Sequence, residues 1–147
     1  MILMTSPDAV LRNGKPYQEL VEILIAAQQK QWRVALVSNS SQPDWFNQVF
    51  GNSGVQFLHS PGRQSGQVVT RNAQKFGLRA FDVLVLAAKD EDVQMGKNGG
   101  ALLLAAGWSA SPEVKKLGIQ ADTAKQLQDV IEITESWEGQ WWCSAEG

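Results

Sequence analysis

Residues 83–92 of the chain read VLVLAAKDED, a short run of branched apolar residues that ends abruptly in a polar cluster. The same pattern occurs twice more, in ILMTSPD at residues 2–8 and in VALVSNSS at residues 34–41. Runs of this kind, separated by segments with helical spacing, are typical of parallel strands that are buried on both faces. In an open α/β sheet the carboxyl ends of such strands form one crevice, where ligands bind. We therefore expect the three polar clusters to meet in space.

The composition is that of one globular domain. The chain has 147 residues, of which 44% are hydrophobic and 19% are charged, and this length suffices for a core without disulfides. Its single cysteine, Cys143, leaves no internal disulfide framework and favours a reduced, cytoplasmic setting. The net charge of −2 argues against a nucleic-acid surface, and the longest apolar run is too short to cross a membrane.

Apolar spacing along the rest of the chain predicts alternating strands and helices. Strands are expected at residues 2–4, 32–37, 55–59, 81–86, 101–106 and 117–119. Helices are expected at residues 16–30, 44–50, 65–76 and 90–98, briefly from 111, and from 122 to about 134. This alternation predicts a single domain over residues 1–147, with a three-layer Rossmann-like α/β fold. Its mostly parallel sheet should have about five strands with helices on both faces, followed by a tryptophan-rich tail at residues 135–147.

Four segments of the chain resemble the motifs of the haloacid dehalogenase-like (HAD) superfamily of phosphatases and related hydrolases. Residues 6–14 are similar to the first motif, Asp-x-Asp-Gly-Thr/Val-Leu, and residues 36–39 to the second, a strand that ends in Thr or Ser. Residues 63–78 follow the third, a Lys or Arg before a helix that ends in Gly-Leu. Residues 85–92, with the glycine pair at 99–100, resemble the fourth, Gly-Asp-x-x-x-Asp. The resemblance extends to about residue 134 and leaves no insert for a cap domain.

The resemblance implies covalent catalysis, in which the first Asp of the first motif attacks phosphorus. Ser6 occupies that nucleophile position, whereas Asp8 matches the family's general acid/base or else braces the loop. Ala88 replaces an acid that binds Mg²⁺ in the family. Asp92 is the acid that remains, as a metal ligand or as a residue that stabilises the start of a helix. The motifs are therefore degenerate, and conventional HAD catalysis is not expected.

The other polar residues of the clusters are candidates for holding a phosphate group. The resemblance assigns this role to Ser38 and Arg63, and Asn39 lies beside them in the pattern. Ser38 and Asn39 are also ordinary turn formers, and Arg63 also suits a solvated loop. Lys89 either fills the lost metal position, where it would neutralise the two remaining acids, or points into water.

Three of the six tryptophans, Trp137, Trp141 and Trp142, crowd the end of the chain. Exposed tryptophans anchor interfaces, which predicts a surface for a protein partner or for self-association, unless the tail folds back over an apolar face. We therefore expect a catalytically degenerate HAD-like domain that recognises a partner or a phosphorylated ligand and needs no cofactor. The alternative is a HAD-like phosphatase or hydrolase with altered chemistry, in which Asp8 acts together with Mg²⁺.

Overall fold

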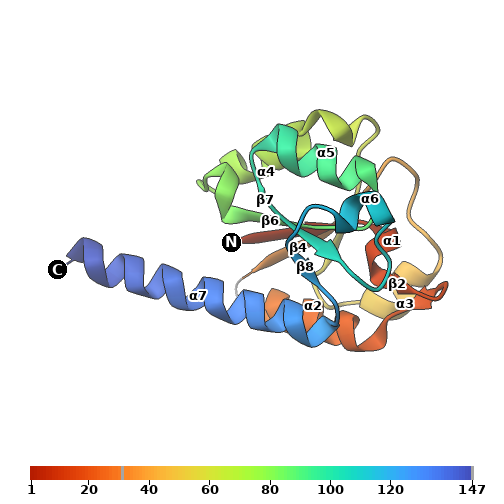
Figure 1. The fold of residues 1–147 in the computed structure, drawn as a ribbon, viewed down its shortest axis with the longest axis horizontal. Coiled ribbons are helices and arrows are strands. Elements are labelled where there is room, and N and C mark those ends of the chain that lie inside the picture. Colours follow the sequence, from red (N-terminus) through yellow and green to blue (C-terminus); the bar gives the residue numbers. More distant parts are fainter. Residues whose placement is uncertain (31, 147) are drawn as a thin grey trace.

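The computed structural model describes residues 1–30 and 32–146, and the side chains up to residue 135 within that range. A central sheet separates two layers of helices, so that the molecule has three layers (Figure 1). Six strands form the sheet, in the order β5-β4-β1-β6-β7-β8, and every neighbouring pair is parallel. The strands are β1 (Ile2–Thr5), β4 (Arg33–Ser38), β5 (Gln56–His59), β6 (Val83–Ala87), β7 (Leu102–Ala106) and β8 (Gln120–Ala121). The expected α/β architecture is confirmed, with six strands where about five were expected.

The long helices cover both faces of the sheet. On one face lie α2 (Gln18–Gln29) and α7 (Ala124–Glu146), and on the other lie α4 (Gln67–Lys75) and α5 (Asp90–Gly99) (Figure 1). Shorter elements complete the chain: α1 (Pro7–Val10), the hairpin β2 (Leu11–Arg12) and β3 (Lys15–Pro16), α3 (Trp45–Phe50), the 3₁₀ turns η1 (Arg63–Ser65) and η2 (Ala80–Asp82), and α6 (Pro112–Lys115).

The last strand is shifted along the chain relative to its predicted position. The last strand was expected at residues 117–119, but β8 follows directly after them, and the Ile119 carbonyl accepts a hydrogen bond from the Ala105 amide. The sheet pairing therefore starts at the end of the predicted segment.

Helix α7 continues well past residue 134, where the sequence-based prediction ended it. The stretch beyond has no proline, and Gly139 is its one glycine before residue 147, so nothing stops the helix at Thr134. In Figure 1 this helix runs beyond the edge of the sheet rather than folding back over it. The side chains of Trp137, Trp141 and Trp142 lie outside the described residues, so their role as a partner surface stays a prediction.

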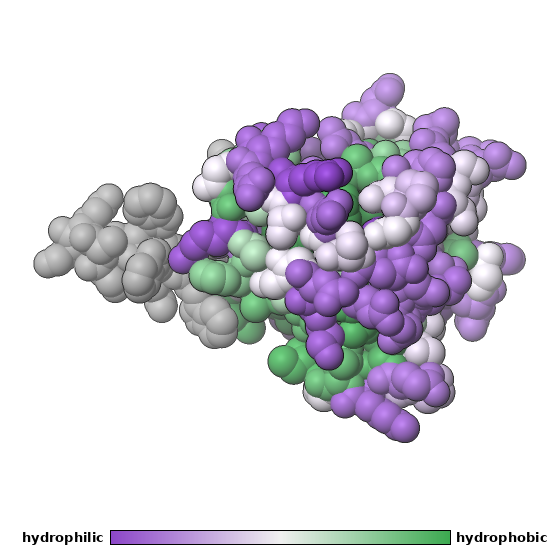
Figure 2. Space-filling view, turned by 90° about the horizontal axis from the view of Figure 1, so that it is seen from above, coloured by the Kyte–Doolittle hydropathy of each residue, from purple (hydrophilic) through white to green (hydrophobic). Residues whose placement is uncertain are grey.

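Strand alternation divides the core into two halves. Leu3 of β1 packs with Leu20, Leu24 and Leu127 in the half under α2 and α7, whereas its neighbour Met4 belongs to the half under α4 and α5. Every residue of β1 and of β6 is buried, as expected for central strands of a parallel sheet. The outer face over α4 and α5 is mostly hydrophilic, with smaller apolar patches (Figure 2). In the described part of the chain, no helix has the length and apolar character needed to cross a bilayer.

Candidate functional site

The site lies where the chain leaves two adjacent strands in opposite directions. Strands β1 and β6 are neighbours in the sheet. From β1 the chain continues to β4, on the side away from β6, and from β6 it continues to β7, on the side away from β1. Such a switch point leaves a crevice at the carboxyl ends of the two strands. Ser6 follows β1 and Ala88 follows β6, so the two positions that the resemblance associates with catalysis meet here.

Asp92 is the centre of the site and is completely buried. It lies in the first turn of α5, and its Oδ2 accepts hydrogen bonds from Ser6 Oγ at 2.8 Å and from the backbone amides of Ala88 at 2.9 Å and Lys89 at 3.1 Å. Its Oδ1 accepts a hydrogen bond from Nη1 of Arg63, with which it forms an ion pair. Both carboxylate oxygens are thus occupied by donors from this chain.

Arg63 is directed inwards by the loop that carries it. Asn39 Oδ1 accepts hydrogen bonds from the amides of Gly62 at 3.1 Å and Arg63 at 3.4 Å, so the end of β4 fixes the backbone after β5. Gly66 then has a left-handed φ of 80° and lies against the backbone of Gly99, where a Cβ would come within 2.3 Å of the Gly99 nitrogen. The Arg63 side chain is 5% exposed, and its Nε has no partner among the described residues. A phosphate in the crevice would therefore meet a guanidinium whose charge is already balanced by Asp92.

Asp8 and Lys89 form a second ion pair, nearer to solvent. Lys89 Nζ lies 3.2 Å from Asp8 Oδ2, and the two side chains are 54% and 45% exposed. Trp108 Nε1 donates to the Ala9 carbonyl at 2.7 Å and thereby holds α1, which carries Asp8. Lys89 was expected either to neutralise both acids or to point into water, and it pairs with Asp8 alone among the described residues. Asp92 receives its counter-charge from Arg63 instead.

Ser38 and Asn39 make the hydrogen bonds of ordinary turn formers. Ser38 Oγ accepts from the Ser40 amide at 3.0 Å, and Asn39 uses its side-chain oxygen on the loop that carries Arg63. Their role in holding phosphate stays a prediction.

The donor set does not fit a magnesium ion. Mg²⁺ requires oxygen ligands, usually one or two carboxylates with water. Asp92 has both oxygens bound to internal donors, Asp8 is paired with a lysine, and positions 6 and 88 supply no carboxylate. Within the described residues, no group of three or more His, Cys, Asp or Glu side chains is arranged to hold a metal ion.

The pair of Arg63 with Asp92 is the feature that sequence reasoning missed. A signal for it was present, because the motif order places two cations, Arg63 and Lys89, at the same crevice as the two remaining acids. A buried carboxylate needs a counter-charge, and Arg63 was one of the two cations assigned to that crevice.

Comparison with known proteins shows a likeness in fold. No protein-family model matches the chain, and no curated protein matches it. Among solved structures, the chain is similar to a crystal structure of a "putative phosphoglycolate phosphatase" from Lactobacillus delbrueckii subsp. bulgaricus, with a TM-score of 0.62 and 19% sequence identity. The match covers 79% of this chain and 53% of that one, so it spans about half the length of that protein. At this identity the likeness shows the fold alone, which is a three-layer Rossmann-like α/β fold with a parallel sheet.

Proposed function

We propose that this chain is a catalytically degenerate HAD-like domain that acts by binding rather than by phosphoryl transfer. The observation that supports this most is the closed network around Asp92, in which Ser6, Arg63 and two backbone amides use both carboxylate oxygens. The network fills the place where the resemblance would put a nucleophile and a metal ion.

Ser6 is a poor substitute for the family's nucleophile. Its hydroxyl donates to Asp92, which resembles a pair of nucleophile and base. Both oxygens of that carboxylate, however, already accept other hydrogen bonds, from the Arg63 guanidinium and from two backbone amides. Ser6 is also fully buried, so a substrate phosphorus could not reach its oxygen without opening the network.

A protein partner suits the site better than a phosphorylated ligand. Of the two cations at the crevice, Arg63 is paired with Asp92 and Lys89 is paired with Asp8. The charge of each cation is therefore balanced by a carboxylate, which weakens the attraction of the crevice for a phosphate. The tryptophan-rich end of α7 is the partner surface that the sequence predicts.

An enzyme that uses Asp8 is the competing function, and the phosphatase named in the structural match favours it. Asp8 is 45% exposed at the mouth of the crevice, which a nucleophile or general base would need. The two functions make opposite predictions for the same assay.

The test is turnover of p-nitrophenyl phosphate and of phosphoglycolate in the presence of Mg²⁺. We expect wild type to be no faster than Asp8→Asn, and Mg²⁺ to leave the thermal unfolding temperature unchanged. Turnover that Asp8→Asn abolishes would overturn the proposal. The double variant Ser6→Asp with Ala88→Asp restores the two lost acids and is expected to gain stabilisation by Mg²⁺. A double variant that folds but remains insensitive to Mg²⁺ would show that the lost acids do not explain the degeneracy.

A further inference from the structure

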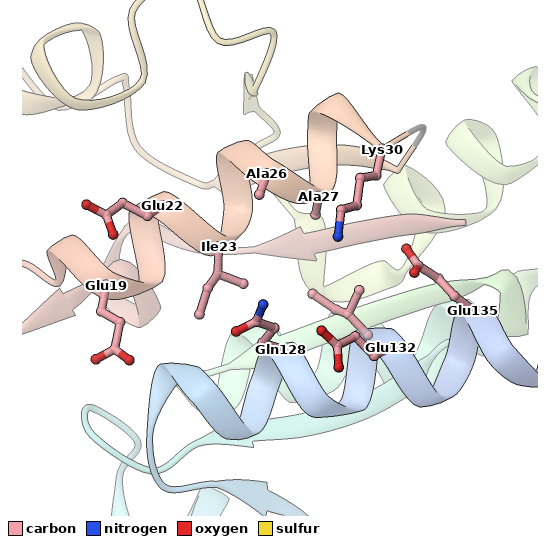
Figure 3. Close-up of a pocket in the computed structure, with 10 residues that line it drawn as sticks. Glu19, Glu22, Ile23, Ala26, Ala27, Lys30, Gln128, Glu132 and Glu135 are labelled. Carbon is pink, nitrogen blue, oxygen red and sulfur yellow. The ribbon is translucent and has the colours of Figure 1, made fainter.

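A groove separates α2 from α7 on the outer side of their layer (Figure 3). It has a volume of about 300 Å³, and none of its lining residues belongs to the crevice. Its floor is apolar, formed by Ile23, Ala26 and Ala27 of α2 and by Ile131 of α7. Ile23 points across the gap towards α7 in Figure 3.

The floor is shaped to admit another helix. Ala26 is exposed and Ala27 is buried, and neither has side-chain atoms beyond Cβ. Small residues at a contact let two helix backbones approach closely, and helix packing distances depend on the side chains at the contact. The α2 side of the groove extends over a helix of 12 residues, about 18 Å in length, which matches about three turns of a partner helix.

The rim of the groove is strongly acidic. Glu19 and Glu22 line it from α2, and Glu132 and Glu135 line it from α7. Lys30 is the one basic residue among its described lining residues. The whole chain has a net charge of −2, so this concentration of carboxylates on one apolar groove is a local feature. It complements a cationic surface.

Contacts with the core hold the α7 wall in place. Glu135 Oε1 accepts a hydrogen bond from Nε1 of the buried Trp32 at 2.7 Å, which ties α7 to the start of β4. Leu127 and Ile131 are buried beneath α7. A rim that is fixed before binding needs less ordering when a partner docks.

We propose that the groove between α2 and α7 docks a cationic amphipathic helix of a partner protein. Apolar residues of that helix contact Ile23 and Ala26, and lysines or arginines flank them and face the glutamates of both walls. Helices that lie in apolar grooves in this way are a common mode of recognition. The inference rests on the binding role proposed above and gives that role a partner of stated chemistry.

The test uses a peptide of about 14 residues, long enough for about four helical turns, with leucine and lysine at helical spacing. We expect saturable binding that weakens as salt is added, with NMR shifts at Ile23, Ala26 and Ile131. A scrambled peptide of the same composition should bind at least about tenfold more weakly, because its leucines do not share a face. A peptide with glutamate in place of lysine should not bind.

Two arginine substitutions on α2 separate groove binding from general attraction. Ala26→Arg fills the floor and is expected to weaken binding of the leucine–lysine peptide at least about tenfold. Gln29→Arg adds the same charge to the same helix at an exposed position outside the groove lining, and should leave binding unchanged within error. Glu22→Gln with Glu132→Gln should weaken binding and reduce its salt dependence, and this variant keeps the test valid if Ala26→Arg fails to fold.

Absence of binding, equal binding of the scrambled peptide, or equal binding to Ala26→Arg would each overturn the inference. The readout is peptide affinity, whereas the proposed function is tested by phosphatase turnover. A chain that binds the peptide and also hydrolyses phosphate would refute the non-catalytic role and keep the docking groove. A chain that neither binds the peptide nor hydrolyses phosphate would refute the docking groove and leave the proposed non-catalytic role intact.

Discussion

Replacing Arg63 by methionine should destabilise the fold far more than the loss of an ordinary surface charge. Arg63 is the cation paired with the fully buried Asp92 in the described part of the chain, and breaking a buried ion pair costs about 3–5 kcal/mol. Three donors, from Ser6 and two amides, remain on the carboxylate, and the substitution also removes the unpartnered Nε of Arg63. Both effects reduce the loss, so we expect about 3 kcal/mol, or a fall in Tm of about 10 °C for a chain of this size.

Urea denaturation followed by circular dichroism measures this loss, with two comparisons. Lys89→Met breaks the half-exposed pair with Asp8 and should cost less than about 1 kcal/mol. The double variant Arg63→Met with Asp92→Asn should be less destabilised than the sum of the single variants by at least about 2 kcal/mol, because neither charge is then left unpaired. A cost of Arg63→Met no larger than that of Lys89→Met, or additive effects in the cycle, would refute the reasoning that the pair closes the site.

Three further substitutions test other contacts. Gly66→Ala should cost more than about 2 kcal/mol in the free energy of unfolding, since φ is +80° and the new Cβ would meet backbone, whereas Gly62→Ala, with a φ of +77° and open space around it, should cost about 1 kcal/mol. Burial raises the pKa of Asp82, but hydrogen bonds from Arg79 and its charge lower it more, so the folded-state pKa lies below the ordinary value of 3.8. Asp82→Asn should therefore lower stability at neutral pH by less than about 1 kcal/mol, and the difference from wild type in pH-dependent unfolding should shrink as the pH falls below 3.8. Trp32→Phe removes the hydrogen bond to α7 and should lower the free energy of unfolding by about 1 kcal/mol in urea denaturation. An unchanged free energy of unfolding would contradict this prediction.

Much of the fold follows from local sequence patterns. The long strands coincide with branched apolar runs, and the helices on both faces follow the spacing of their buried residues. The hairpin β2–β3 and the helix α1 were not predicted, because elements of two to four residues are too short to show a periodicity. Pro7 at the first turn of α1 also reads as a loop residue in sequence, although proline is well accommodated there.

The sequence indicated which residues lie near one another at the crevice, but it did not indicate which of them form hydrogen bonds and ion pairs with one another. Motif order brought Ser6, Ala88 and Asp92 together correctly, since all three follow strands whose carboxyl ends are adjacent. Whether Arg63 faces solvent or the interior depends on contacts that are distant in sequence. The Asn39 side chain and the close approach of Gly66 to α5 fix its loop, and no local pattern encodes either contact.

The order of the strands also sets the order in which this sheet can be built during synthesis. Of these six strands β1 is synthesised first, and it lies in the interior of the sheet, where it pairs with residues 33–36 on one side and 83–85 on the other. β4 and β5 can add to one edge of β1 as they emerge, and β6, β7 and β8 then add in turn to the opposite edge. Until β6 is made, that edge of β1 is an unpaired apolar template, which is the state most prone to aggregate with another nascent chain.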